Sequence, residues 1–278
     1  MSDTLVEALA RRFSWPDGCG VVLAGSTAEG VAMRGSNVNV LVVDAPYGWA
    51  PPGDGTPRVV RPMSLCLNHI YSCDPVISLE VLRPLDGLAE LAAGMSRVGD
   101  PGTPDLELPV LDVLEIRLLS RLRGGLVLHG DETVERWRKR MELGWLPAFH
   151  CATTYLTALH FHRKAATAQA DGLPLDASVQ LRLAVEHLLV SALAADDRVL
   201  HEVKNLGRHL TADLSAAVDR PRLLVEAGAL LRRDMTAVPE LFARIEELAA
   251  GLLDWLPGTE HGATAARYLR GQGLGGRP

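Results

Sequence analysis

Residues 21–44, VVLAGSTAEGVAMRGSNVNVLVVD, contain two apolar runs separated by a segment rich in glycine and serine. The runs at 21–24 and 38–43 consist almost entirely of valine and leucine and are bounded by turn-forming residues, which is typical of β-strands. The second run is nearly continuous in its apolar character, so we expect it to be buried on both faces. Gly25 and Ser26 follow the first strand directly and should form a tight turn.

The order of these features resembles the DNA-polymerase-beta-like nucleotidyltransferase superfamily, particularly its antibiotic-modifying and minimal members. In that superfamily a Gly-Ser pair is followed about ten residues later by Asp-x-Asp on a strand. Gly25, Ser26 and Gly30 match this pattern. The resemblance implies that Gly25 and Ser26 bind a ligand, because a glycine turn lets backbone N–H groups approach an anion closely.

Both aspartates of the family motif are absent, and Asn37 and Asn39 stand in their places. Side chains at i and i+2 of a strand point the same way, so two aspartates there can hold a pair of Mg²⁺ ions. Mg²⁺ prefers anionic oxygen, whereas an amide offers only a neutral carbonyl. We therefore expect no metal ligand at either position, no required cofactor, and at most weak Mg²⁺ binding. Asn37 and Asn39 would instead form hydrogen bonds to a ligand.

The family takes a third carboxylate from a later strand, and the expected strand at 76–82 contains Glu80. Ser78 precedes it by two residues and lies on the same face. We assign Glu80 to the catalytic position, with Ser78 as the alternative alignment. One remaining carboxylate is insufficient for two metal ions, so Mg²⁺-dependent nucleotidyl transfer should be lost or weak.

Helical periodicity fills nearly all of the chain after about residue 85. The predicted fold class is therefore α+β: a small mixed nucleotidyltransferase-type sheet with helices, residues 1–125, followed by an all-helical substrate-type domain, residues 126–278. A helix at 3–13 and a further strand at 58–70 are also expected. The remaining predicted helices lie near residues 86–97, 105–123, 131–141, 146–170, 175–195, 201–217, 220–233 and 236–255.

Residues 178–214 loosely resemble the helical substrate domain of the same superfamily. Glu186 lies in an apolar helix and corresponds to the glutamate that acts as a base in some relatives. Its alternative role is that of a glutamate on a helix surface. Lys204 and Arg208, one helical turn apart, are candidate phosphate ligands or part of a solvated face. We expect one ligand cleft between the sheet and these helices.

Composition restricts the partners of this 278-residue chain. Its net charge of −6 is spread without a long basic block, which argues against nucleic acid. No apolar run reaches the ~20 residues that span a bilayer, and the N-terminus lacks the order of a signal peptide. We therefore expect a cytoplasmic protein without a membrane partner. Cys66, His69 and Cys73 are spaced like part of a zinc site but lack a fourth ligand.

These features favour a nucleotidyltransferase-fold protein with a degenerate two-metal site, repurposed to bind or transform a nucleotide or small polar ligand in a bacterial biosynthetic pathway. The first alternative is an active adenylyltransferase of a small hydroxylated or amino substrate. That alternative requires unusual metal ligation, or asparagines introduced in place of native aspartates. The second alternative is a non-catalytic interaction protein whose helical half is a docking surface. The oligomeric state is not indicated.

Overall fold

The computed structural model describes residues 7, 9, 12–28, 30, 32, 36–46, 49, 59–62, 66–71, 76–82, 89–90, 92–100, 108–200, 206, 229 and 239–274. The chain forms two compact units. The sheet unit consists of Met1–Ala93 and Leu111–Gly144, and the helical unit of Gly94–Val110 and Trp145–Pro278.

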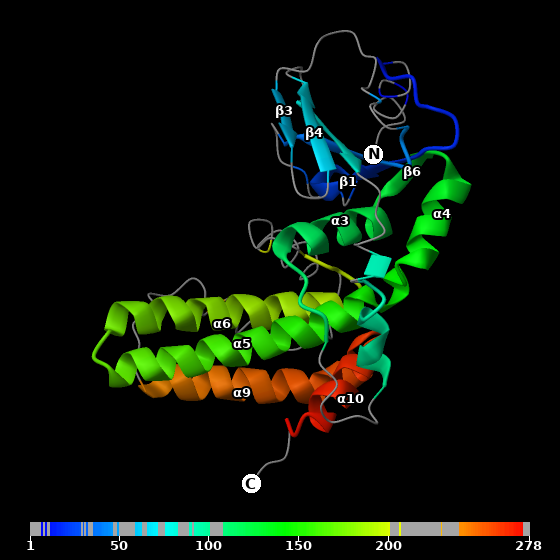
Figure 1. Ribbon diagram of the computed structural model, residues 1–278. Coiled ribbons are helices and arrows are strands. Elements are labelled where there is room, and N and C mark those ends of the chain that lie inside the picture. The colour runs from blue at the N-terminus through cyan, green and yellow to red at the C-terminus, as the bar shows by residue number, and fades with distance from the viewer. Residues whose placement is uncertain are drawn as a thin grey trace. The chain divides into compact units, whose positions relative to one another are not determined.

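The sheet unit contains a six-stranded mixed sheet with the strand order β3-β4-β5-β2-β1-β6 (Figure 1). The strands β2 and β5 are parallel, and all other neighbouring pairs are antiparallel. The sheet and its helices confirm the predicted α+β fold class. The strands are β1 Gly20–Ala24, β2 Val38–Val43, β3 Val59–Pro62, β4 Cys66–Tyr71, β5 Ile77–Leu82 and β6 Leu126–His129.

The expected strands at 21–24, 38–43 and 76–82 correspond to β1, β2 and β5. The prediction of one strand at 58–70 is wrong, because the chain turns back within it and forms the antiparallel pair β3 and β4.

Strand β6 was not expected, and it extends the sheet unit beyond the predicted boundary at residue 125. It hydrogen-bonds to β1 in antiparallel register. The next helix, α4 (Asp131–Arg140), packs on β1 through Val134, which lies where a Cβ on Gly20 would be. Both elements therefore belong with the sheet.

The two faces of the sheet have different coverings. One face forms an apolar core that includes Phe13, Val40 and Leu79. Helix α3 (Val113–Gly124) lies against the other face, where a Cβ on Gly125, just after the helix, would collide with Val22 (Figure 1). Helix α3 starts later than the expected 105, at a capping box formed by Asp112 and Glu115.

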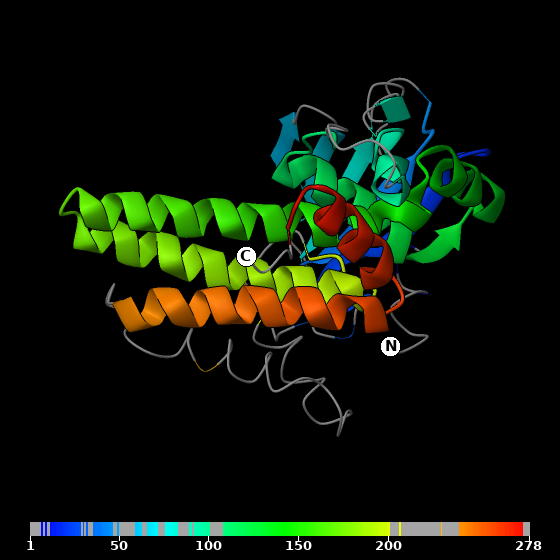
Figure 2. The same cartoon turned by 90° about the horizontal axis from the view of Figure 1, so that it is seen from below.

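The helical unit is built on three long helices that lie side by side (Figure 2). Helix α6 meets the length and hydropathy of a membrane span, but most of it is buried inside the structure, as in the core helix of a water-soluble protein. The elements are η2 Met95–Gly99, α5 Leu146–Ala170, α6 Pro174–Ala195, α9 Pro239–Trp255, η5 Leu256–Gly258 and α10 Gly262–Gly271, and η3 Leu143–Trp145 precedes α5.

The expected helices at 131–141, 146–170, 175–195 and 236–255 are confirmed within a few residues as α4, α5, α6 and α9. Helix α10 was not expected. At the N-terminus, positions 7, 9 and 12 of the expected helix are helical. Positions 89, 90 and 92 are also helical and lie within the expected helix at 86–97. The expected helices at 201–217 and 220–233 fall almost entirely outside the described residues.

Candidate functional site

Gly25 and Asn39 lie against one another on the α3 side of the sheet. The backbone of Gly25 has φ 71°, in the left-handed region, and a Cβ at this position would be 2.9 Å from Asn39 Nδ2. Glycine is therefore required by its backbone conformation and by the close approach of the amide. Strand register places Asn39 between Ala24 of β1 and Ser78 of β5. The turn and the second motif position thus share one edge of the sheet.

Ser26 and Asn37 flank this contact at the surface. Ser26 lies in the short 3₁₀ turn Gly25–Thr27 and is half-buried. Asn37 is exposed and precedes β2 by one residue. The Asn39 side-chain amide donates a hydrogen bond of 3.4 Å to the backbone carbonyl of Asn37. The expected hydrogen bonds from these asparagines to a ligand stay a prediction.

Glu80 lies on the same face as Asn39 but deeper in the sheet. Parallel pairing places Asn39 beside Ser78 and Leu41 beside Glu80. The two pairs are separated by one pleat, about 6.6 Å along the strands. Glu80 is buried, with its side chain 3% exposed, and Ser78 is also buried. Register and burial are thus compatible with either residue as the third position of the family motif.

Two arginines on α3 hold the Glu80 carboxylate. Arg121 Nη1 donates a hydrogen bond of 2.6 Å to Glu80 Oε2, and Arg117 Nη2 lies 3.4 Å from Glu80 Oε1. The arginine side chains are 10% and 19% exposed, respectively. Glu80, Arg117 and Arg121 together form a largely buried ion-pair cluster, the Glu80 cluster.

Sequence reasoning missed Arg117 and Arg121 as members of the site. Their spacing of four residues on a predicted helix was a signal that they share one face. The identity of their partner was not readable, because Glu80 precedes Arg121 by 41 residues and lies on a different element.

The donors at this edge of the sheet do not fit Mg²⁺. Among the described residues, they are the neutral amides of Asn37 and Asn39, the hydroxyls of Ser26 and Ser78, and the Glu80 carboxylate, whose two oxygens each face a guanidinium group. A hard divalent cation requires anionic oxygen that it need not share with competing cations. Across the described residues, no group of three or more His, Cys, Asp or Glu side chains is arranged to hold a metal ion. Of the suggested zinc fragment, Cys73 lies outside the described residues.

Glu186 lies on α6 in the helical unit and takes part in an ion pair along the helix. Its carboxylate accepts a hydrogen bond of 3.1 Å from Arg182 Nε, one turn earlier, and its side chain is 14% exposed. Lys204 and Arg208 lie outside the described residues. The predicted cleft between the sheet and residues 178–214 therefore stays a prediction.

Two buried polar side chains of the helical unit, those of His150 and Cys151, have hydrogen-bond partners. Burial lowers the pKa of His150 to about 4, and its Nε2 lies 2.8 Å from the Leu200 carbonyl. Burial likewise raises the pKa of the Cys151 thiol to about 12, so this thiol is not reactive near neutral pH. Neither residue has the properties of a catalytic acid, base or nucleophile.

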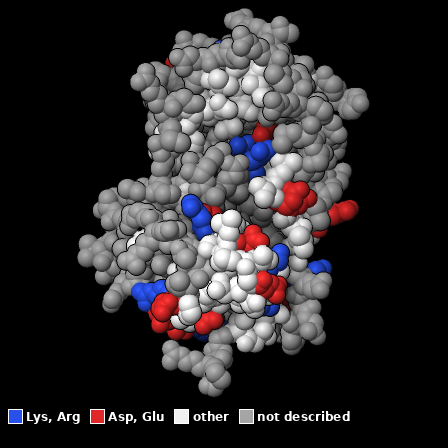
Figure 3. Space-filling model, turned by 90° about the vertical axis from the view of Figure 1, so that its left-hand side faces the viewer, with Lys and Arg blue, Asp and Glu red and all other residues white. Residues whose placement is uncertain are grey.

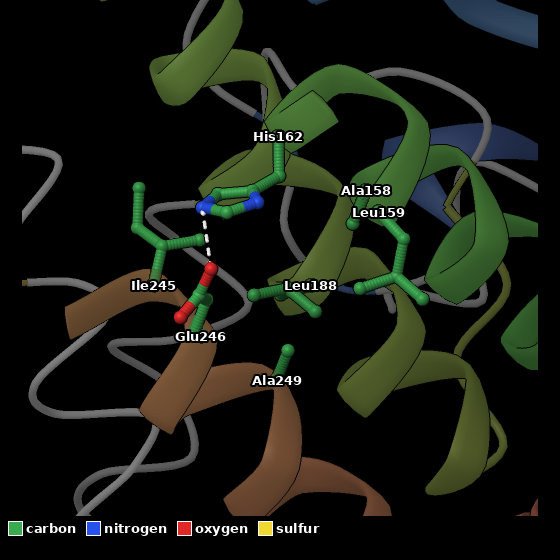
Figure 4. A pocket seen from close by; sticks show the side chains of 7 residues that line it. All are labelled: Ala158, Leu159, His162, Leu188, Ile245, Glu246 and Ala249. Atoms are coloured by element: carbon green, nitrogen blue, oxygen red, sulfur yellow. Dashed lines mark ion pairs between the residues drawn. The ribbon is translucent and has the colours of Figure 1, made fainter. Parts of the chain in front are cut away.

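One pocket of the helical unit lies between α5, α6 and α9 (Figure 4). Its empty volume is about 210 Å³, part of which is open solvent, and this is below the usual size of a small-molecule site. His162 Nε2 lies 3.8 Å from Glu246 Oε1 at its rim, too far for a hydrogen bond. The rest of the lining is apolar, so this pocket offers little for recognition of a nucleotide. It is lined by Ala158, Leu159, His162, Leu188, Ile245, Glu246 and Ala249.

No protein-family model matches the chain, and no curated protein matches it. Among solved structures, the chain is similar to a nucleotidyltransferase-like protein from Exiguobacterium sibiricum 255-15. The two are 13% identical with a TM-score of 0.41, and the match covers 96% of this chain and 76% of that chain. At this TM-score the likeness supports no assignment of residues, so the roles proposed below come from the contacts of the site.

Proposed function

We propose that this protein is a nucleotidyltransferase-fold protein that has lost two-metal catalysis and now binds, or transforms by other means, a nucleotide or small polar ligand. The observation that carries the proposal is the Glu80 cluster. The single buried carboxylate at the expected third position is engaged by Arg121 and Arg117.

Both requirements of two-metal transfer are missing. Asn37 and Asn39 supply no negative charge, and Mg²⁺ could bind Glu80 only by displacing a guanidinium group at 2.6 Å. Arg117 and Arg121 would also repel the two metal ions, which further opposes their binding.

The polar surface that remains suits a ligand that is held by hydrogen bonds. The Asn39 amide contains both donors and an acceptor, and it is half-buried beside the Gly25 turn. Ser26 adds a hydroxyl group in the same turn. Such convergent polar groups can orient a nucleotide or a small polar molecule without a metal ion.

Pyrophosphate release tests the loss of two-metal chemistry. The full chain is incubated with each nucleoside triphosphate, with Mg²⁺ or Mn²⁺, in the presence of small hydroxylated and amino acceptors. We expect no turnover above the rate without enzyme. The Asn37→Asp/Asn39→Asp variant should gain little, because Glu80 remains held by Arg121. Robust turnover by the unaltered chain would overturn the proposal and establish the active adenylyltransferase.

An interaction protein is the second candidate function. Leu173 and Leu175, at the start of α6, are 50% and 77% exposed, and Val179 one turn later is 49% exposed. Apolar side chains exposed together are a common feature of protein interfaces. If a panel of nucleotides and polar metabolites gives no thermal shift, while Leu175→Ser removes self-association or partner binding, this second function replaces the first.

A further inference from the structure

We propose that the pocket between α5, α6 and α9 binds a primary alkylammonium group (Figure 4). The ammonium nitrogen would lie between His162 and Glu246, and the alkyl chain would lie on the apolar lining. The group belongs either to a free short-chain amine or to a lysine side chain. This inference is independent of the proposed function, because all the residues that carry it belong to the helical unit.

The ring of His162 is held in place and carries an unsatisfied nitrogen. It packs edge to face on Phe242 of α9, with the ring centroids 5.6 Å apart. The His162 side chain is 14% exposed, and its Nε2 is buried without a hydrogen-bond partner among the residues that the structure describes. A buried polar atom without a partner costs free energy that a ligand with a matching group recovers.

The separation of His162 and Glu246 defines the matching group. Glu246 Oε1 faces His162 Nε2 at 3.8 Å (Figure 4). A ring N–H group that donated to this carboxylate would bring the two atoms to about 2.8 Å. The longer separation indicates that both atoms are acceptors, which a neutral imidazole allows. An ammonium nitrogen can lie about 2.9 Å from each of them and donate to both.

The remaining lining suits a short alkyl chain. It consists of apolar side chains from three helices, namely Ala158, Leu159, Leu188, Ile245 and Ala249. The empty volume of about 210 Å³ includes open solvent, so the pocket admits the end of a chain rather than a molecule of nucleotide size. A short-chain amine and the stem of a lysine both combine such a chain with a compact cation.

Surface charge does not by itself select a cation on the face that Figure 3 shows. There the Lys and Arg side chains lie among Asp and Glu side chains. Mixed charges produce no extended field of one sign. Selection of an ammonium group therefore depends on contacts in the pocket, where Glu246, at 69% exposure, is the carboxylate that a ligand reaches.

NMR titration of the full chain near neutral pH, at constant ionic strength, tests this inference. The probes are n-butylammonium, Nα-acetyl-lysine amide, n-butanol and tetramethylammonium. Both primary ammonium probes should shift the amide signals of α5 and α9 around the pocket, and the tighter of the two identifies the source of the group. They should bind about tenfold more tightly than n-butanol, which has the chain without the charge. Tetramethylammonium has the charge without an N–H donor and should not bind.

Variants assign the binding to the two acceptors. Glu246→Gln removes the charge and keeps the shape of the rim, so it should weaken binding of n-butylammonium by about fivefold or more. The matched control, Glu247→Gln, removes the same charge from the next residue of α9, which is 65% exposed and paired with Arg244, and should change affinity less than twofold. His162→Phe keeps a ring against Phe242 but removes Nε2, and it should also weaken binding.

Three results would overturn the inference. Equal binding of n-butanol and n-butylammonium would show that the apolar lining alone explains binding. Equal weakening by Glu246→Gln and Glu247→Gln would show that general attraction explains it. The absence of shifts with every probe would show that water satisfies the two acceptors. Circular dichroism confirms that each variant is folded, and pyrophosphate release tests the proposed function separately.

Discussion

Replacement of Glu80 by glutamine should destabilise the sheet unit by about 3 kcal/mol or more. Glutamine has nearly the same shape, so packing against α3 is retained. The charge that faces Arg117 and Arg121 is lost, and the carboxylate that both largely buried guanidinium groups contact becomes a neutral amide.

The magnitude follows from the balance of attraction and desolvation. Opposite charges about 4 Å apart attract one another by about 4 kcal/mol at an effective dielectric constant of 20. The two contacts of Glu80 therefore represent about 8 kcal/mol of gross attraction. Desolvation of the three ions offsets most of this in the intact cluster, since each ion loses several kcal/mol. Removal of one partner leaves the desolvation of the others in place, and such changes cost about 3–5 kcal/mol.

Urea unfolding measures this cost, and hydrogen exchange at the amides of β5 and α3 localises it. The matched control is Glu135→Gln. Glu135 also lies 2.6 Å from an arginine, Arg138, but its side chain is 64% exposed. An exposed pair of this kind contributes about 0–1 kcal/mol. If Glu80→Gln costs no more than Glu135→Gln, the buried cluster does not form as described, and competition from Arg121 no longer opposes Mg²⁺ binding at Glu80.

Three further predictions address the turn and the helical unit. In urea unfolding, Gly25→Ala should lower the free energy of unfolding by at least 1 kcal/mol more than Gly30→Ala, since both glycines have positive φ but only Gly25 contacts Asn39. Asn39→Ser should reduce this difference between the two variants. Equal losses of stability would show that Gly25 and Asn39 are not in contact. Folding lowers the pKa of His150 from 6.5 to about 4, so His150 is protonated in the unfolded chain at a higher pH than in the folded chain. The free energy of unfolding should therefore fall by up to about 3 kcal/mol as the pH drops from 6.5 to 4. His150→Gln should reduce this pH dependence, measured as the urea midpoint at each pH. If the midpoint changes with pH as steeply in the variant as in the unaltered chain, His150 is not its source. Tyr155→Phe removes a buried hydrogen bond of 3.0 Å to a carbonyl of α9 and should lower the free energy of unfolding by about 1–2 kcal/mol; no loss would show that water replaces the bond.

The local features of the site region were readable from the sequence. Valine-rich runs next to Gly25 and Asn39 predicted β1 and β2, because strand propensity and turn chemistry act over a few residues. The long helices α5, α6 and α9 were also predicted, since their apolar pattern persists over several turns. Asn37 and Asn39 stand where the family that the sequence resembles has aspartates, and the identity of single residues needs no structure to recognise.

Pairing between distant segments was not readable. Residues 126–129 are too short a run to indicate a strand, and β6 exists because β1, over 100 residues earlier, offers it an edge. The division of residues 58–70 into β3 and β4 likewise depends on the antiparallel pairing of β4 with β5.

The ion-pair partners of Glu80 were determined by tertiary structure alone. The sequence identified it as a carboxylate at the right point of a strand, which is equally compatible with a metal ligand and with an ion-pair partner. The outcome depends on how α3 packs against the sheet, because that packing brings Arg121 within 2.6 Å of Glu80 across 41 residues of chain. Local propensity determines the strand and the helix separately, whereas their contact is determined by burial of both apolar faces in a single core.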